Sequence, residues 1–328
     1  MSRNFVMLGT GAWSSALASM LSKNGHKIKM WGIDKSEILD INKGVNTKYF
    51  ASSKFNNPEN IEATSDLKYA LENVDIIVVA VPTPVISSVL TQVKTHLGNR
   101  KISIINVAKG INPETKEFFS AVIKNAIGSN LIDICSVIGP SFAIDVFNNK
   151  MTMVNAVGEN IEFLTKITNY FTTSSFKLIP NTDEKASETF SALKNVLAIG
   201  MGIASGLFDS QNLLPALISL GLKEIFQIAK FLSPETSDTV GYELAAVGDI
   251  VLTCLNPTSR NFSFGLEIAK NGVQKAIAMN VKTVEGYNTA KILEKILQNK
   301  KAPEAPFISN IISVLLHNLN PREILNFI

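Results

Sequence analysis

Short runs of apolar residues alternate with segments of helical periodicity through the first 180 residues of the chain. Five of these runs are predicted to be β-strands, because they are short and rich in β-branched residues. They lie at 5–8, 28–31, 76–81, 102–105 and 134–138. Most are apolar on both faces, which is typical of parallel strands covered by helices on both sides.

Helical patterns lie between these runs, near 12–24, 85–96 and 114–126. Gly25 ends the first of them, as glycine commonly does after a helix. Each segment occupies the crossover position of a βαβ unit. The first half is therefore predicted to be an α/β domain with a Rossmann-type doubly wound parallel sheet.

The pattern changes after residues 179–183, and helical periodicity continues from Glu184 to the C-terminus with almost no strand-like runs. Breaks in the periodicity fall near Ser210, 233–234, 256–257, Gly272 and 303–306. An all-α C-terminal domain should follow the sheet, with the chain divided into 1–184 and 185–328.

The first predicted strand runs directly into Gly9-Thr10-Gly11-Ala12-Trp13-Ser14 and then a helix. This is the context of a dinucleotide-binding turn, in which Gly9 permits a tight turn and Gly11 lets the backbone approach a pyrophosphate. Ser14 stands where the fingerprint has its third glycine, and a purely structural strand-to-helix turn is the alternative. Asp34 follows the second strand, where an acidic residue accepts a ribose hydroxyl. A nicotinamide dinucleotide is the favoured cofactor.

Other polar residues interrupt apolar segments further along the chain. Lys109 follows a strand, at the edge of the sheet where α/β proteins bind ligands, although spacing alone equally fits a solvated lysine. Lys194 interrupts an otherwise apolar helix. Because an unpaired buried ammonium is costly, this side chain either extends to water or is held for catalysis. Both interpretations stay open from the segment alone.

Arg260 is conspicuous because the 31 basic residues include only four arginines. It lies between Ser259 and Asn261, and a guanidinium in such a setting suits bidentate phosphate recognition, for which lysine is not equivalent. A surface ion pair is the alternative. Glu285 stands at a predicted helix start, where it could cap the helix or contact the cofactor.

Composition narrows the classes of function. The chain is 46% hydrophobic and only 18% charged, which favours an extensive core and allows a homodimer interface. The net charge is +3 with basic residues spread along the chain, so no nucleic-acid partner is expected. Two distant cysteines and three scattered histidines indicate neither a disulfide nor a metal site.

The N-terminus has no signal-peptide pattern, and the longest weakly polar stretch, 193–207, is too short to cross a bilayer. A cytoplasmic protein without membrane insertion is expected.

Together, these segments resemble the NAD(P)-dependent glycerol-3-phosphate dehydrogenase family of bacterial type. The matching segments occur in register over essentially the whole chain: 9–18, 108–110, 139–143, 193–195, 248–254, 259–265 and 284–286. The resemblance implies reversible hydride transfer between NAD(P)H and dihydroxyacetone phosphate, which gives sn-glycerol 3-phosphate for phospholipid synthesis. It makes 1–184 the dinucleotide-binding domain and 185–328 the helical substrate-binding and catalytic domain.

The resemblance also implies roles for individual residues. Lys194 would be the catalytic proton donor and acceptor, and an ammonium hydrogen-bonded to the substrate oxygen would stabilise its developing charge. The phosphorylated triose would contact Lys109, Gly139, Ser141, Lys194, Asp249, Ser259, Arg260 and Asn261. The cofactor would contact residues of the glycine turn and of several later segments: Gly9, Gly11, Ala12, Trp13, Ile33, Asp34, Lys109, Ala143, Arg260 and Glu285.

Three positions depart from the family pattern. Ser14 replaces a glycine and should shift the following helix slightly. Ile33 stands where the family often has a cation for the 2′-phosphate of NADPH, so that NAD is expected to be preferred over NADP. Leu220 replaces a common arginine, and this change has no functional account.

Two alternatives remain from the sequence. One is another two-domain dehydrogenase of β-hydroxyacid or 6-phosphogluconate type, which shares the domain order and a catalytic lysine. The 259–261 segment argues against it. The other is a non-catalytic dinucleotide-binding sensor, which the departures at Ser14 and Ile33 would fit.

Overall fold

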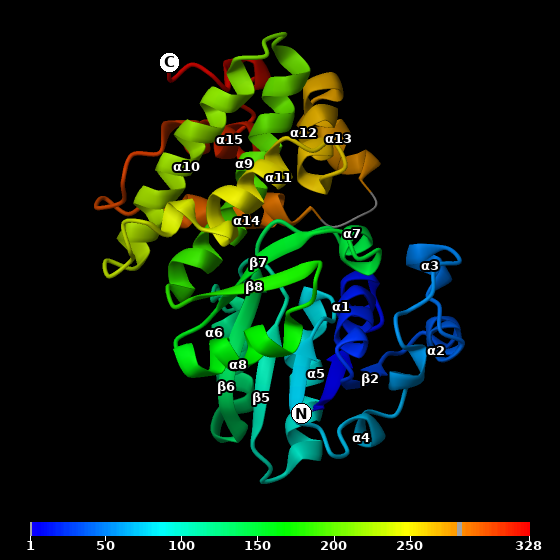
Figure 1. The fold of residues 1–328 in the computed structure, drawn as a ribbon. Helices are drawn as coiled ribbons and strands as arrows, with labels where there is room; N and C mark the ends of the chain where they lie inside the picture. Colours follow the sequence, from blue (N-terminus) through cyan, green and yellow to red (C-terminus); the bar gives the residue numbers. More distant parts are fainter. Residues whose placement is uncertain (1, 281–283) are drawn as a thin grey trace. The chain divides into compact units, whose positions relative to one another are not determined.

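The computed structural model describes residues 2–280 and 284–328. It contains two compact units (Figure 1). The first comprises Met1–Ala108 and Glu117–Thr182, and the second comprises Lys109–Lys116 and Asp183–Ile328. The short segment Lys109–Lys116 thus packs with the C-terminal helices, although it leaves the sheet at the end of a strand.

The first unit is built on an eight-stranded sheet of order β3-β2-β1-β4-β5-β6-β7-β8. The strands are β1 Asn4–Leu8, β2 Lys27–Trp31, β3 Ile61–Thr64, β4 Ile76–Val79, β5 Ile102–Asn106, β6 Leu131–Ile138, β7 Thr152–Val157 and β8 Phe176–Asn181. Neighbouring strands are parallel except for β6 and β7, which pair antiparallel. The doubly wound sheet is therefore confirmed, with one antiparallel pair that the sequence did not predict.

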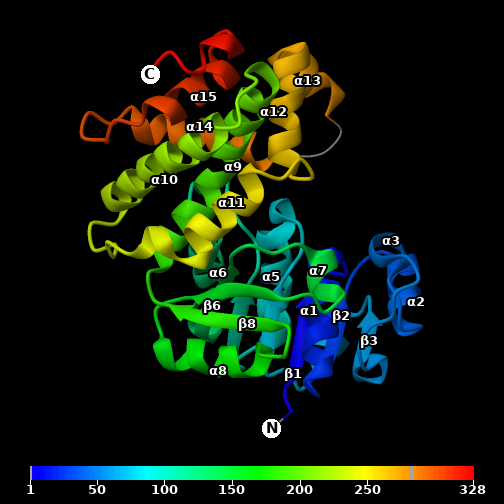
Figure 2. The ribbon, with the colours of Figure 1, turned by 45° about the horizontal axis from the view of Figure 1, so that its top comes forward.

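Helices cover both faces of this sheet. They are α1 Ala12–Lys23, α2 Lys35–Asn42, α3 Thr47–Phe50, α4 Leu67–Ala70, α5 Ile86–Leu97, α6 Phe119–Ile127, α7 Ala143–Phe147 and α8 Ile161–Phe171. Phe5 and Met7 of β1 pack on the face covered by α1 and α8. Val6 and Leu8 pack on the face covered by α5 and α6 (Figure 2). The period of two along a strand thus feeds two separate apolar cores.

The helix predicted over 114–126 begins later, at Phe119. Asn112 Oδ1 accepts hydrogen bonds from the backbone N–H groups of Glu114 and Thr115, which is the pattern of a helix cap, but the turn that follows is short. Lys116 also takes a left-handed conformation with φ +60°. A left-handed residue ends a helical turn, so the regular helix begins only after Lys116.

The second unit consists of helices. They are α9 Glu184–Leu207, α10 Leu213–Leu232, α11 Asp249–Cys254, α12 Arg260–Asn271, α13 Val273–Met279, α14 Glu285–Leu297 and α15 Pro306–Leu316. A π-helical turn at Leu244–Gly248 leads into α11. The C-terminal helical architecture predicted from the sequence is confirmed.

Helix α9 is the core of this unit (Figure 1). It spans 24 residues and, by length and composition alone, could cross a membrane. The weakly polar stretch is therefore longer than residues 193–207, the bounds taken from the sequence. However, 83% of its most apolar window is buried among the other residues. The burial is that of a core helix, which accounts for its apolar composition.

Glycines let other helices approach α9 at backbone distance. A Cβ atom at Gly265 of α12 would lie 2.1 Å from the Ile199 carbonyl oxygen, and one at Gly202 would lie 2.1 Å from that of Phe262. At the start of α14, a Cβ at Gly286 would lie 2.4 Å from the Asn195 carbonyl oxygen. These contacts fix the N-terminal ends of α12 and α14 against the middle of α9.

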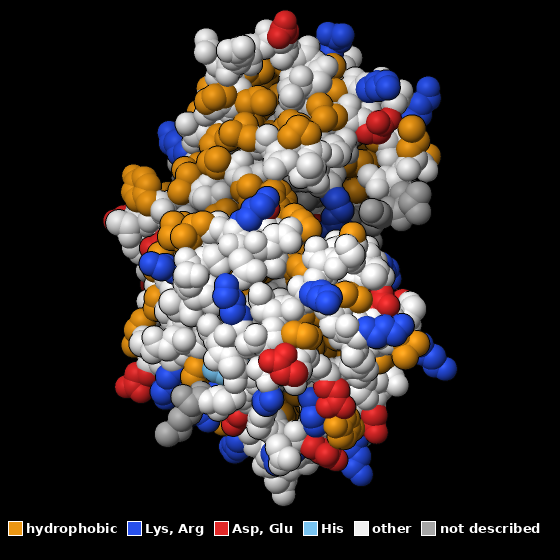
Figure 3. Space-filling model, turned by 45° about the vertical axis from the view of Figure 1, so that its right-hand side comes forward, with side chains coloured by type: hydrophobic (Ala, Val, Ile, Leu, Met, Phe, Trp, Pro, Cys, Tyr) orange, Lys and Arg blue, Asp and Glu red, His pale blue; other side chains and the backbone are white. Residues whose placement is uncertain are grey.

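The surfaces of the two units differ in the view of Figure 3. Apolar side chains form patches over the helical unit, whereas charged side chains are dense over the sheet-containing unit. Large apolar residues exposed on the helical unit include Leu220, Tyr242, Val251, Leu255, Ile277 and Met279.

Candidate active site

Two lysines meet one buried carboxylate in the helical unit. Asp249, the first residue of α11, places Oδ2 2.9 Å from Nζ of Lys109 and 3.6 Å from Nζ of Lys194. The side chains of Asp249 and Lys194 are only 3% and 6% exposed. Lys194 therefore does not extend to water, and of the two interpretations left by the sequence, the solvated one is wrong.

Two further side chains hold the Lys194 ammonium. Its Nζ donates to Thr253 Oγ1 at 3.1 Å and to Asn195 Oδ1 at 3.3 Å. Thr253 stands one helical turn after Asp249 and donates in turn to Asp249 Oδ1 at 3.4 Å. The sequence prediction missed Thr253, although its spacing of four residues from Asp249 on a helix was the available signal.

Burial dominates the electrostatics of this cluster. Desolvation lowers the pKa of Lys194, Lys109 lowers it further, and Asp249 opposes both. A lysine of lowered pKa can both donate and accept a proton nearer to neutral pH than an exposed one. Cys254 lies beside it and donates its thiol hydrogen to the Lys194 carbonyl oxygen, and burial raises the pKa of this thiol to about 12. The thiol is therefore protonated and unreactive.

An amide network connects Lys194 to α12 and α14. Asn195 Oδ1 accepts from Asn261 Nδ2 at 3.0 Å, and Asn195 Nδ2 donates to Glu285 Oε2 at 3.2 Å. Asn261 Oδ1 accepts from the backbone N–H of Gly286 at 3.0 Å. The buried Asn261 side chain thus connects three helices by hydrogen bonds. Only the backbone N–H of Asn261, at the start of α12, is then left to bind an anion.

The start of α12 combines a helix N-terminus with a guanidinium. Ser259 is the N-cap residue, and its Oγ accepts from Phe262 N at 3.5 Å. The Arg260 side chain is 60% exposed, and its Nη2 lies 3.5 Å from Glu285 Oε1. Helix N-termini and guanidinium groups are both suited to phosphate.

Glu285 does not cap α14. The N-cap residue of α14 is Val284, and no side chain of the described residues caps this helix. The carboxylate of Glu285 instead meets Arg260 and Asn195. The capping interpretation from the sequence is wrong, and the structure leaves Glu285 as a partner of these two side chains.

In the first unit, the glycine turn after β1 is tightly constrained at Gly9 and open at Gly11. Gly9 has φ +119°, and a Cβ there would lie 2.7 Å from the Ala80 carbonyl oxygen, so that only glycine fits. A Cβ at Gly11 would meet no atom of the described residues within 4 Å. Open space therefore lies before the N-terminus of α1, where backbone N–H groups attract an anion.

Ser14 is accommodated inside this turn. Its side chain is buried, and Oγ donates to the Gly9 carbonyl oxygen at 2.6 Å. The hydroxyl that replaces a third glycine thus closes the turn from within, and its polar group is satisfied.

Asp34 caps α2 at the end of β2. Its Oδ1 accepts from the backbone N–H groups of Ser36 and Glu37 and from Ser36 Oγ. These bonds, led by that from the Ser36 hydroxyl, lower the pKa of Asp34 to about 2. Ile33 beside it is 85% exposed. One carboxylate oxygen, Oδ2, is left over from capping.

Two family models match the chain. The one described as NAD-dependent glycerol-3-phosphate dehydrogenase N-terminus matches residues 4–164, and the one described as the C-terminus of the same enzyme matches residues 183–326. The chain belongs to this family. The resemblance seen in the sequence segments is thereby confirmed.

Curated relatives that match this chain over nearly their whole length are also described as glycerol-3-phosphate dehydrogenases. A glycerol-3-phosphate dehydrogenase [NAD(P)+] of Malacoplasma penetrans is 40% identical over 97% of this chain and 93% of its own. One from Mesoplasma florum is 34% identical over 99% of this chain and 96% of its own. The crystal structure of glycerol-3-phosphate dehydrogenase from Coxiella burnetii superposes with a TM-score of 0.86 at 28% identity, covering 99% and 98% of the two chains.

The remaining family positions lie in the first unit. Gly139 follows β6, and a Cβ there would lie 2.9 Å from Val154 Cα. Ser141 Oγ donates to the Gly139 carbonyl oxygen at 3.2 Å, and Ala143 begins α7. Of the predicted site residues, the first unit holds Gly9, Gly11, Ala12, Trp13, Ile33, Asp34, Gly139, Ser141 and Ala143. The second holds Lys109, Lys194, Asp249, Ser259, Arg260, Asn261 and Glu285.

Leu220, the third departure from the family pattern, is 39% exposed on α10. Nothing in the structure explains why it replaces an arginine.

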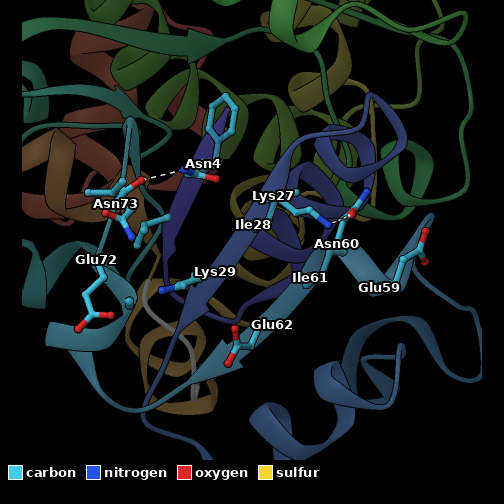
Figure 4. Close-up of a pocket in the computed structure, with 14 residues that line it drawn as sticks. Asn4, Lys27, Ile28, Lys29, Glu59, Asn60, Ile61, Glu62, Glu72 and Asn73 are labelled. Carbon is cyan, nitrogen blue, oxygen red and sulfur yellow. Dashed lines mark hydrogen bonds between the residues drawn. The ribbon is translucent and has the colours of Figure 1, made fainter. Parts of the chain in front are cut away.

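A separate pocket of about 320 Å³ lies at the other edge of the sheet (Figure 4). Asn4, Lys27 and Ile61 line it, at the amino ends of β1, β2 and β3. Ligands of open α/β sheets bind at the carboxyl ends of the strands, where Gly9 and Asp34 lie. The pocket in Figure 4 thus lies at the opposite ends of the strands from the glycine turn.

Among the described residues, no group of three or more His, Cys, Asp or Glu side chains is placed to hold a metal ion.

Proposed function

We propose that this protein is a glycerol-3-phosphate dehydrogenase that interconverts dihydroxyacetone phosphate and sn-glycerol 3-phosphate with NAD(P)H. The observation that carries the proposal is the buried cluster of Lys194, Asp249 and Lys109, in a chain of this family. The product is the backbone precursor of phospholipids, so that a role in phospholipid synthesis follows from the same proposal.

The bound nicotinamide would supply or accept the hydride at C2 of the substrate. As the carbonyl oxygen becomes an alkoxide, the Lys194 ammonium stabilises its charge and then donates the proton from Nζ. Thr253 and Asn195 accept two of the three ammonium hydrogens, which leaves the third for the substrate oxygen. Asp249 offsets the repulsion between the two ammonium groups and orients both. In the reverse direction the neutral amine of Lys194 accepts the proton.

The substrate phosphate would bind at the start of α12. The exposed guanidinium of Arg260, the cap at Ser259 and the backbone of Asn261 support this assignment. We assign Lys109, Gly139 and Ser141 to the same substrate.

Replacing Arg260 with lysine is expected to raise the KM for dihydroxyacetone phosphate about 10- to 150-fold. A charge-assisted hydrogen bond contributes about 1.5 to 3 kcal/mol, and lysine cannot reproduce the bidentate geometry. Steady-state kinetics at saturating NADH measure the change. Arg322→Lys, an exchange of the same kind elsewhere on the helical unit, is the control and should leave the KM unchanged. An unchanged KM in Arg260→Lys would show that the Arg260 guanidinium does not bind the substrate phosphate.

For the dinucleotide, we propose contacts with the turn and with residues near the substrate. The open space before Gly11 and the constrained Gly9 support the turn as the pyrophosphate site. The proposed cofactor residues are Gly9, Gly11, Ala12, Trp13, Ile33, Asp34, Lys109, Ala143, Arg260 and Glu285.

NADH is expected to be used with a higher kcat/KM than NADPH. The exposed Ile33 offers no charge to a 2′-phosphate, and the Asp34 carboxylate, ionised above its pKa of about 2, repels one. The measurement is oxidation of each cofactor with dihydroxyacetone phosphate, repeated with β-hydroxyacid and 6-phosphogluconate substrates. Equal or better use of NADPH would refute the preference. Turnover of the β-hydroxyacid or 6-phosphogluconate substrates alone would refute the proposed reaction. Absence of turnover with every substrate would favour the non-catalytic dinucleotide-binding sensor.

We propose further that 1–184 serves as the dinucleotide-binding domain and 185–328 as the substrate-binding and catalytic domain of a cytoplasmic homodimer. The low charged fraction and the apolar patches over the helical unit support the dimer. Sedimentation equilibrium tests it, and a monomer at micromolar concentration would contradict it.

A further inference from the structure

A polar cluster behind the glycine turn connects it to the helix that Asp34 caps. Its centre is Glu37 of α2, whose side chain is 7% exposed. Glu37 Oε2 accepts from Thr10 Oγ1 at 2.5 Å, and Oε1 accepts from Lys48 Nζ of α3. Tyr49 OH also donates to Oε1, at 3.4 Å. Both oxygens of this buried carboxylate are thus engaged.

The position of Thr10 is fixed by its surroundings. A Cβ at Gly32 would lie 2.5 Å from Thr10 Cγ2, so that the threonine side chain packs against the chain just before Asp34. Asn46 Nδ2 donates to the Thr10 carbonyl oxygen at 3.0 Å and to Ser15 Oγ at 2.9 Å. Because Asn46 is the N-cap residue of α3, the helix that contains Lys48 is anchored to the turn as well.

Lys48 stands between two carboxylates. Its Nζ bonds to Glu37 and lies 3.5 Å from Asp34 Oδ2, the oxygen that does not take part in capping. The hydrogen bond to Glu37 is the largest of the effects that raise the pKa of Lys48. The side chain is about half exposed, and two carboxylates against one ammonium leave a formal charge of −1 beside Asp34.

We infer that Glu37 is a specificity-determining residue that acts through Lys48. By binding the Lys48 ammonium, Glu37 withholds the cation that lies beside Asp34 and keeps the local charge negative. A ribose 2′-hydroxyl can then donate to Asp34 Oδ2, whereas a 2′-phosphate meets excess negative charge. The inference rests on the proposed function in one respect, the location of the adenosine ribose at Asp34.

Two substitutions test the charge balance in opposite directions. Glu37→Gln keeps the size of the side chain and an oxygen for Thr10 but removes the charge that holds Lys48. The ratio of kcat/KM for NADPH to that for NADH should rise about tenfold or more, because close charges at a protein surface interact strongly. Lys48→Gln leaves two unbalanced carboxylates, and the same ratio should fall.

Binding without turnover provides a second readout. Calorimetric titration with 2′,5′-ADP and with 5′-ADP isolates the 2′-phosphate, and the ratio of their dissociation constants should move with the kinetic ratio. Thr10→Val is the structural control, because it removes a bond to Glu37 without changing any charge. It should weaken binding of both nucleotides together and leave the ratio unchanged.

Asp34→Asn separates this inference from the proposed function. If Asp34→Asn raises the ratio while Glu37→Gln and Lys48→Gln leave it unchanged, or move it in the same direction, Glu37 does not act through Lys48 and the ribose site stands. If none of the three variants moves the ratio, the ribose does not lie at Asp34, and the proposed cofactor site fails with the inference. Opposite shifts in Glu37→Gln and Lys48→Gln support the inference.

Discussion

Replacing Lys194 with alanine is expected to lower kcat for reduction of dihydroxyacetone phosphate about 10²- to 10⁴-fold, as loss of a general acid does. The side chain is buried and its ammonium is held by Thr253, Asn195 and the Asp249 carboxylate, so that solvent cannot easily replace it. Steady-state kinetics of NADH oxidation give the value. Lys185→Ala, which removes an exposed lysine from the same helix, is the matched control and should retain full activity.

Binding measurements separate chemistry from folding in this variant. Fluorescence titration should show NADH binding to Lys194→Ala with little change, and the Lys194→Met variant, which fills the buried volume, should be equally inactive. A wild-type rate in Lys194→Ala would exclude Lys194 as the proton donor and would favour the non-catalytic alternative.

The pH dependence should report the same ammonium. Because the pKa of Lys194 is lowered, the ammonium that reduction requires is lost at a lower pH than for an ordinary lysine. The reduction rate should fall as pH rises through this pKa, and the oxidation rate should rise. Asp249 raises the pKa of Lys194, so Asp249→Asn should move both limbs to lower pH. Limbs that stay in place would contradict the coupling.

Gly265→Ala is expected to reduce the free energy of unfolding by about 3 kcal/mol or more, as overpacking of a rigid core does. The new Cβ would lie 2.1 Å from the Ile199 carbonyl oxygen and 2.9 Å from Gly202 Cα, which are backbone atoms that cannot rotate away. Denaturant titration measures the loss. Gly241→Ala is the control, because its Cβ would meet no described atom within 4 Å.

The same variant should also affect the substrate. Moving α12 away from α9 displaces Arg260 from Lys194, so that the KM for dihydroxyacetone phosphate should rise together with the loss of stability. Unfolding at the wild-type denaturant concentration would show that the two helices separate without cost.

Much of the fold was predictable because several of its strands consist mostly of apolar residues. β1 and β4 are nearly or wholly apolar, as burial on both faces of a parallel sheet requires, whereas β2, β5 and β6 contain a few polar residues among apolar ones. β3 has only four residues, β7 contains the polar residues Thr152 and Asn155, and β8 alternates buried with exposed side chains over its first four residues, so their patterns are weaker. The start of α6 was misplaced because Lys116 takes a left-handed conformation, which ends the turn that Asn112 begins.

The site was predictable only as a set of residue types in order. Whether Lys194 reaches water depends on α11, whose Thr253 and Cys254 contact it from far along the chain. The hydrogen bonds of Asn261 and Glu285 depend in the same way on the packing of α12 and α14 against α9. Glu37 and Lys48 carried no local signal, since the bond from Thr10 to Glu37 spans 27 residues.

The grouping of Lys109–Lys116 with the C-terminal helices has a consequence for recombination between relatives. Lys109 lies in the N-terminal half of the sequence, but its ammonium pairs with Asp249, which lies in the C-terminal half. A chimera joined near residue 183 would inherit this loop from one parent and its carboxylate partner from the other. Successful exchange of halves therefore requires that residues 109–116 be transplanted together with the helical segment.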